Sequence, residues 1–237
     1  MNTSNREQLL VEDLHAYYGQ SHILHGVNMV VRRGELVTLL GRNGAGRSTT
    51  LRAIMNMVGK RSGSIMINGT ETMDIAAHLI PRLGVGFCPE ERGIFASLNV
   101  EENLLLPPTV RSGGMGLDEL YEMFPNLYER RFSQGTRLSG GEQQMLAMAR
   151  ILRTGANLLL LDEITEGLAP VIVQKLGEVL LKLKEKGLTI VLVEQNFRFA
   201  APLADRHYLM EHGKIIDEIS AAELPSKQEY LSKSLGV

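Results

Sequence analysis

A glycine-rich stretch, "GRNGAGRST" at residues 41–49, constrains the fold of this 237-residue chain more than any other feature. It follows the apolar run "LVTLL" and precedes "STTLRAIMNMV", where apolar residues recur at helical spacing. Glycines at such spacing let successive backbone N–H groups turn toward a polyphosphate, and the start of the next helix adds its dipole. The sequence therefore predicts a strand, a phosphate-binding loop and a helix, in that order.

The spacing G-x-x-x-x-G-x-S in this loop assigns roles to individual residues. Ser48 supplies a hydroxyl group for a magnesium ion. A glycine-rich turn that binds nothing is the alternative, but the position between a strand and a helix is the one that phosphate binding requires. The residues expected to contact the phosphates are Gly41, Asn43, Gly44, Ala45, Gly46, Arg47, Ser48 and Thr49.

Arg47 stands where such loops normally use lysine. A guanidinium group keeps the positive charge, but it is broader than an ammonium group and prefers bidentate pairing with oxygens. We expect nucleotide binding to persist and hydrolysis to be slowed, because the charge that grows in the transition state is no longer met at the right position. The rival expectation is that the longer side chain reaches the same oxygens and leaves catalysis intact.

The apolar run "LLLLDE" ends in two carboxylates, Asp162 and Glu163. Ligands of open α/β sheets lie at the carboxyl ends of the strands, so both side chains are expected beside the phosphate loop. Asp162 is then a candidate magnesium ligand, and Glu163 a candidate for orienting and polarising the attacking water. An Asp-Glu pair after an apolar run is often only a charged helix start, so this assignment depends on the glycine loop.

A second anion site is predicted at "LSGGEQQ", where Ser139, Gly140 and Gly141 open a helix with backbone N–H groups and a hydroxyl. One nucleotide has only one polyphosphate. Either these residues cap their own helix, or they complete a nucleotide site on another subunit.

The remaining pattern predicts an α/β fold. Apolar strands at residues 157–163 and 188–195 alternate with helices at 140–154 and 172–186, which favours a mainly parallel sheet covered on both faces. Residues 8–40 predict an N-terminal β region, and hairpin turns are expected at Asn68-Gly69 and His212-Gly213. Residues 74–82 are expected to be helix-like, and residues 91–137 form a mainly helical insert.

Composition narrows the possible partners. The formal net charge of −2 gives no electrostatic reason to expect nucleic acid as a partner. A single cysteine, Cys88, excludes an intrachain disulfide framework and suits a reducing compartment. The polar N-terminus "MNTSNREQLLVEDL" lacks the apolar core of a signal peptide, and no apolar run reaches the about 20 residues of a membrane span.

Together these motifs resemble the ATP-binding subunit of ABC transporters over essentially the whole chain. "PEERGIFASLNVEENL", "LDEITEGLAP" and "LVEQN" resemble in particular the subunit of branched-chain amino acid importers, or of the similar urea importers. The resemblance implies a P-loop NTPase core with an antiparallel N-terminal β region and a helical sub-domain. It implies one ABC ATP-binding domain over residues 1–237, with an α/β core at 1–90 and 138–237 and a helical sub-domain at about 91–137.

The resemblance also implies roles for further residues. Tyr18 matches an aromatic residue that stacks on adenine, although core packing would suit Tyr17 equally well. Glu90 lies where the family usually has a glutamine that contacts magnesium. Gln195 lies where a switch histidine is usual, and it can donate to the terminal phosphate without titrating or simply cap the strand end. Ile164 replaces a usual proline next to Glu163.

The family further implies ATP and Mg²⁺ as ligands and a second ATP-binding subunit, identical or different, as a partner. It implies transmembrane permease subunits, indirectly a solute-binding protein, and a peripheral position on the cytoplasmic face of the inner membrane. Two other functions compete with that of an importer ATPase. A nucleotide-binding switch that seldom hydrolyses ATP fits Arg47 and Gln195, whereas Glu163 favours hydrolysis. A soluble ABC ATPase acting on DNA or ribosomes is disfavoured by the near-neutral charge and the absence of a second cassette.

Overall fold

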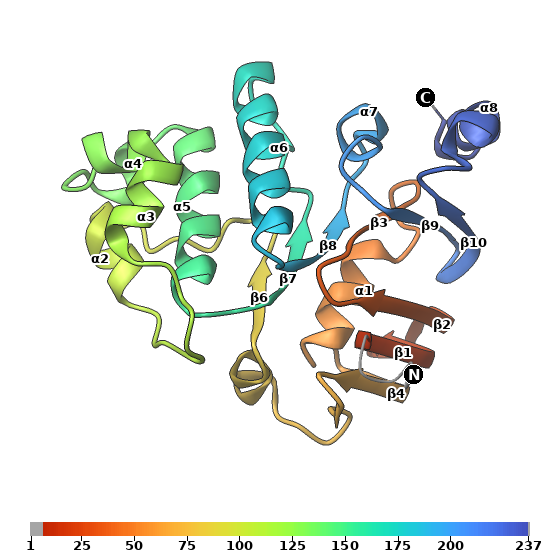
Figure 1. Cartoon of the computed structure of the whole chain (residues 1–237). Helices are drawn as coiled ribbons and strands as arrows, with labels where there is room; N and C mark the ends of the chain where they lie inside the picture. Colours follow the sequence, from red (N-terminus) through yellow and green to blue (C-terminus); the bar gives the residue numbers. More distant parts are fainter. Residues whose placement is uncertain (1–6, 237) are drawn as a thin grey trace.

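A mainly parallel six-stranded sheet forms the centre of the molecule (Figure 1). The computed structural model describes residues 7–236, so the first six residues of the polar N-terminus lie outside it. The strand order is β10-β9-β3-β8-β7-β6, and each neighbouring pair is parallel except β9 and β10. The strands are β3 (Leu36–Leu40), β6 (Val85–Cys88), β7 (Leu158–Asp162), β8 (Thr189–Val193), β9 (Arg206–Glu211) and β10 (Lys214–Ser220).

The predicted N-terminal β region is a separate four-stranded antiparallel sheet with the order β2-β1-β4-β5. Its strands are β1 (Glu7–Tyr18), β2 (Ser21–Arg32), β4 (Lys60–Ile67) and β5 (Thr70–Glu71). Helix α1 (Arg47–Ile54) packs in the hydrophobic cluster that this sheet shares with the central sheet. The α/β fold class predicted from the sequence is confirmed.

The central sheet is buried on both faces, as its apolar strands predict. Along β7, Leu158 and Leu160 belong to the cluster formed with α1 and the antiparallel sheet. Leu159 and Leu161 belong to the opposite cluster, which contains α5 (Gly140–Arg153) and α6 (Pro170–Glu185). Alternate residues of one strand therefore attach the two halves of the molecule to the same sheet.

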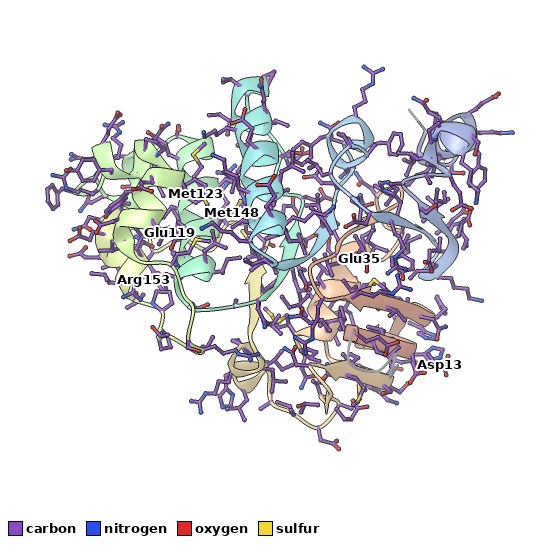
Figure 2. All side chains as sticks on the ribbon, in the orientation of Figure 1. Asp13, Glu35, Glu119, Met123, Met148 and Arg153 are labelled. Carbon is purple, nitrogen blue, oxygen red and sulfur yellow. The ribbon has the colours of Figure 1, made fainter. Side chains whose placement is uncertain are left out.

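Residues 91–137 contain three short α-helices, α2 (Val100–Leu105), α3 (Leu117–Met123) and α4 (Pro125–Glu129), and a 3-10 helix, η3 (Gly135–Arg137). In Figure 1 they lie beside α5 at the edge of the molecule away from the antiparallel sheet. Met123 of α3 and Met148 of α5 lie close together in Figure 2, and both belong to one hydrophobic cluster. The division of the chain at residues 91–137 stays a prediction, and α5 packs with this group of helices.

Three local expectations differ from the structure. Helical spacing extended to Val58, but α1 ends at Ile54, because Asn56 adopts a positive φ of 54°, a conformation that terminates helices. The helix-like stretch at 74–82 is a 3-10 helix, η2 (Ala77–Leu83), with Pro81 inside it. Two helices were not predicted, α7 (Phe197–Ala200) and α8 (Leu224–Leu235). Within the described residues, no helix is long and apolar enough to cross a membrane.

The turn between β9 and β10 connects the sheet to the phosphate loop. Gly213 donates its backbone N–H to the carbonyl of Ala45 (2.9 Å), and its own carbonyl accepts from the backbone N–H of His25 (2.8 Å). Gly213 has a φ of +74°, and a Cβ atom there would lie 2.0 Å from the carbonyl oxygen of Ile23. Only glycine fits between the loop and β2.

We predict that Gly213→Ala destabilises the fold more than Gly69→Ala, a matched change in the hairpin turn between β4 and β5. Gly69 has a φ of +79°, but a Cβ atom there would meet nothing within 4 Å, so its substitution should cost about 1 kcal/mol from backbone strain alone. At Gly213 the steric clash should add about 1–3 kcal/mol. Urea unfolding of both variants measures the difference, and equal losses would contradict it.

Candidate functional site

A cavity of about 370 Å³ lies at the carboxyl edge of the central sheet. The phosphate loop follows β3, Glu163 follows β7 and Gln195 follows the end of β8, so parallel strands bring distant segments together. The residues that line the cavity are Asn43, Gly44, Gly46, Arg47, Ser48, Thr49, Glu90, Glu163, Glu166 and Gln195. Most of the predicted loop residues and Glu90, Glu163 and Gln195 therefore share one cavity.

Glycine shapes the loop where it enters α1. Gly46 is the N-cap of this helix with a φ of 104°, and a Cβ atom there would lie 2.8 Å from Leu24. A side chain at this position would strain the backbone and clash with Leu24, so glycine allows the loop to pack closely against β2. Arg42 holds the other side of the loop by donating to the carbonyls of Ser234 (2.9 Å) and Lys233 (3.0 Å) near the end of α8.

Arg47 is buried and pairs with Glu163. Its Nη2 donates to Glu163 Oε1 (2.8 Å) and to Asn43 Oδ1 (3.2 Å), and only 4% of the side chain is exposed. Burial lowers the pKa of Arg47, and the charge of Glu163 opposes this shift. Its Nη1 is buried and has no hydrogen-bond partner in the described part of the chain. The positive charge of the loop is therefore directed at a carboxylate, with one nitrogen left for a ligand.

Glu163 is held at both carboxylate oxygens. Gln195 Nε2 donates to Oε2 (2.9 Å), while Arg47 occupies Oε1. The backbone of Glu163 has a φ of 47°, a conformation that is rare for residues other than glycine. Such strain persists only where the surrounding structure enforces it, and it is common at functional sites.

Ser48 and Asp162 form a second polar pair in the same region. Ser48 Oγ donates to Asp162 Oδ1 (2.8 Å), whereas Asp162 Oδ2 is buried without a partner among the described residues. Burial raises the pKa of Asp162 to about 6, and the hydrogen bond from Ser48 opposes this shift. A hydroxyl oxygen and an unpaired carboxylate oxygen are suitable ligands for a hard cation such as Mg²⁺.

The residues 7–236 contain no group of three or more His, Cys, Asp or Glu side chains arranged to hold a metal ion. This is compatible with Mg²⁺, which is usually bound through one or two carboxylates together with substrate phosphates and water. Glu90 lines the cavity after the end of β6 and is the third predicted metal residue. Gly41 and Ala45 do not line it, and Ala45 instead accepts the hydrogen bond from Gly213 described above.

The structure distinguishes the two candidate tyrosines. The Tyr17 ring stacks on His22 with 4.2 Å between ring centroids, whereas the Tyr18 side chain is 40% exposed. Tyr18 does not line the cavity. Tyr18 is the more exposed of the two, and its stacking on adenine stays a prediction.

Ser139, Gly140 and Gly141 lie outside the cavity. Ser139 is the N-cap of α5: its Oγ accepts from the backbone N–H of Glu142 (3.3 Å), and the Glu142 carboxylate accepts from the backbone N–H of Ser139 (2.7 Å). The capping alternative is therefore realised within this chain. A role in the nucleotide site of a second subunit stays a prediction.

The sequence did not single out two acidic residues near the site. Glu166 lines the cavity, although the sequence singled it out only as part of the stretch "LDEITEGLAP". Glu194 is buried and bonded to Thr165 beside Glu163. An acidic residue at the end of the apolar run "LTIVLVEQ" was the available signal, since a buried carboxylate requires partners.

A glycine loop opening a helix after β3, an Asp-Glu pair at the end of β7, which β8 separates from β3, and a cavity at this edge of the sheet define a P-loop nucleotide hydrolase. The chain belongs to the ABC transporter family, whose domain profile matches residues 24–166, and it is an ATPase subunit of that family.

Known relatives agree with this membership. The chain is 39% identical over 231 residues to the high-affinity branched-chain amino acid transport ATP-binding protein BraG of Pseudomonas aeruginosa, covering 96% of this chain and 99% of BraG. It is 30% identical to the lipopolysaccharide export system ATP-binding protein LptB of Escherichia coli, over 91% and 92% of the two chains. The dimeric post-hydrolysis structure of the ATP-binding cassette MJ0796 bound to ADP and Pi matches with a TM-score of 0.79 and 25% identity, over 90% and 98%.

The raised pKa of Asp162 predicts a specific pH dependence of stability. Between its ordinary value of 3.8 and about 6, the folded protein binds more protons at this carboxyl than the unfolded chain, so the free energy of unfolding falls as pH rises. From pH 5 to pH 7.5, the free energy of unfolding should fall by about 1 kcal/mol more in the wild type than in Asp162→Asn. Urea unfolding without nucleotide or metal measures this, and identical pH dependence in both proteins would contradict it.

Proposed function

We propose that this chain hydrolyses ATP in the cavity beside residues 41–49 and thereby powers the import of a small polar solute, with branched-chain amino acids as the solute class. One arrangement carries the catalytic part of this proposal: Arg47, Ser48 and Glu163 line the cavity, and the buried Asp162 accepts a hydrogen bond from Ser48. The narrower resemblance of three sequence stretches and the name of BraG support the solute class.

The phosphate chain would bind along the loop. Backbone N–H groups at the start of α1 supply most of the binding energy, together with the helix dipole. Arg47 adds its unpaired Nη1, a buried donor that requires a partner. Tyr18 offers an exposed ring for stacking on the adenine base.

Ser48 Oγ and Asp162 Oδ2 would hold Mg²⁺, with Glu90 as a further residue of the cavity. When bound, the ion neutralises charge on the β- and γ-phosphates. Asp162 must be deprotonated for this role, and burial brings its pKa to about 6, which still leaves it mainly ionised at neutral pH.

Glu163 would orient and polarise the attacking water. Its carboxylate lies in the cavity between Arg47 and Gln195. Gln195 can position this carboxylate and then donate a hydrogen bond to the terminal phosphate. The Nη2 group of Arg47 is already occupied by Glu163 and Asn43. Arg47 therefore restrains the Glu163 carboxylate and can contact the phosphate with only one nitrogen. Hydrolysis would be slow because the charge on the phosphate is only partly compensated.

ATPase subunits of this family work as dimers with transmembrane permease partners. We propose that the α5 N-terminus, with Ser139, Gly140 and Gly141, contacts the nucleotide held by a second subunit. Within one chain these residues lie outside the cavity, so a second copy or a paralogous subunit must supply them. A solute-binding protein would act indirectly, through the permease.

A groove of about 340 Å³ is the proposed contact for the permease at the cytoplasmic face of the membrane. Its lining is mostly apolar, and Arg92 and Arg150 contribute to it, which suits an amphipathic segment with acidic residues. Pro89, in the groove, directly precedes Glu90 in the nucleotide cavity, so the two sites are adjacent along the chain. The groove residues are Met55, Pro81, Val85, Gly86, Phe87, Pro89, Arg92, Gly93, Pro107, Val110, Ala147, Arg150, Ile151 and Thr154.

Three alternatives follow from specific observations. The LptB relatives act in export, and urea importers share the sequence stretches that favour an importer. The Arg47–Glu163 pair favours a third function, a nucleotide switch that closes on ATP and seldom hydrolyses it.

Co-purification with the permease subunits and reconstitution into liposomes test the proposed solute. Leucine, isoleucine or valine bound to a matched binding protein should stimulate ATP hydrolysis and accumulate in the lumen, whereas urea should do neither. Stimulation by urea alone, or transport only out of the vesicle, would replace the importer assignment with one of the alternatives.

We predict that Arg47→Lys raises the rate of ATP hydrolysis about tenfold, since loss of one preorganised donor costs about 10²–10³ in rate and arginine misplaces the charge only in part. Nucleotide affinity should change little, because binding is spread over many loop N–H groups. Single-turnover hydrolysis and nucleotide titration of both proteins measure these quantities. Equal hydrolysis rates would show that arginine reaches the same oxygens.

A further inference from the structure

Glu194 is a buried carboxylate directly after the last residue of β8. Only 2% of it is exposed, and burial raises its pKa to about 7. Both of its oxygens accept hydrogen bonds from one residue: Oε1 from the backbone N–H of Thr165 (3.1 Å) and Oε2 from the Thr165 hydroxyl (2.9 Å). A buried carboxyl is costly unless it is well bonded, so this position requires both donors of Thr165.

Thr165 lies two residues after Glu163, in the turn that follows β7. The backbone N–H of Glu163 donates to the carbonyl of Val193 (2.9 Å), and Ile164 between them is fully buried. Residues 163–165 are therefore attached to the end of β8 at two successive positions, Val193 and Glu194. These attachments lie on either side of the strained backbone of Glu163.

We propose that Glu194 and Thr165 act as a positioning pair that holds the Glu163 carboxylate at the reacting phosphate, an inference that rests on the role proposed above for Glu163. Glu194 is followed directly by Gln195, which donates to Glu163 Oε2. One short segment at the end of β8 thus fixes both the backbone after Glu163 and one oxygen of its carboxylate.

The location of the pair predicts which kinetic step depends on it. Neither Thr165 nor Glu194 lines the nucleotide cavity, and their hydrogen bonds join them to each other rather than to the phosphate loop that carries most of the binding donors. Loss of the pair would release the turn that carries Glu163 and leave the loop in place. The rate of the chemical step should fall, while the affinity for ATP should not.

A matched control lies at the other end of the same strand. Thr189 begins β8, is fully buried and donates its hydroxyl to Gln8 Oε1 (2.5 Å), far along the strand from Glu194. Thr189→Val likewise removes a buried hydroxyl that donates to a side-chain oxygen, and it also removes the acceptor of the Gly34 backbone N–H (2.8 Å), so it is at least as disruptive to the structure as Thr165→Val. A purely structural role predicts equal effects of the two substitutions on hydrolysis.

The experiment compares single-turnover hydrolysis of radiolabelled ATP by the full chain in Thr165→Val, Thr165→Ser, Glu194→Ala, Glu194→Gln and Thr189→Val. Thr165→Val and Glu194→Ala should lower the maximal rate about tenfold, because a small misplacement of a reacting group is enough for such losses. The ATP concentration at half-maximal rate should stay within about twofold, since the binding loop is unchanged. Thr165→Ser keeps the hydroxyl and Glu194→Gln keeps an acceptor oxygen. Both variants should therefore hydrolyse ATP at a rate close to that of the wild type.

Equal rates in Thr165→Val and Thr189→Val, or a loss of ATP affinity that accounts for the slower hydrolysis, would overturn the proposal. Glu163→Gln separates this failure from failure of the proposed function. If Glu163→Gln abolishes hydrolysis while the Thr165 and Glu194 variants match the control, only the positioning pair is wrong. If Glu163→Gln hydrolyses ATP normally, the role of Glu163 itself is wrong. In the double variant Glu163→Gln/Thr165→Val, the second change should cause no further loss.

Discussion

The parallel pairing of β3 with β8 and of β8 with β7 places the whole site. These three strands are buried on both faces, so their register is fixed by packing on two sides. Since they run in the same direction, their carboxyl ends meet at one edge. The phosphate loop, Asp162 and the segment Glu194–Gln195 therefore lie together at that edge.

The charge of Arg47 has a structural consequence as well as a chemical one. A buried guanidinium needs an anionic partner, and Glu163 supplies it across 116 positions of sequence. The same carboxylate is the one proposed to orient the attacking water. Asp162 lies beside them, and its Oδ2, like Nη1 of Arg47, is buried without a hydrogen-bond partner among the described residues.

Local patterns predicted those parts of the structure that depend on neighbouring residues. The loop at residues 41–49 was predictable because glycine spacing, a preceding strand and a following helix act over a short range. Asp162 and Glu163 were predictable because they end an apolar strand. The end of α1 and the 3-10 helix η2 were not, since Asn56 and Pro81 change the backbone at single positions within otherwise helical patterns. Helix α8 was missed because its apolar positions are few and its packing is tertiary.

The sequence by itself determined that this chain has a phosphate loop with arginine in place of lysine, two carboxylates after a buried strand and an α/β architecture. Each of these follows from residue type and spacing within about 10 residues. Only the tertiary structure decided that Arg47 pairs with Glu163, that Tyr17 stacks on His22 while Tyr18 stays exposed, and that Thr165 is bonded to Glu194. Those contacts join different strands and loops, so they depend on strand order and register, which no local pattern specifies.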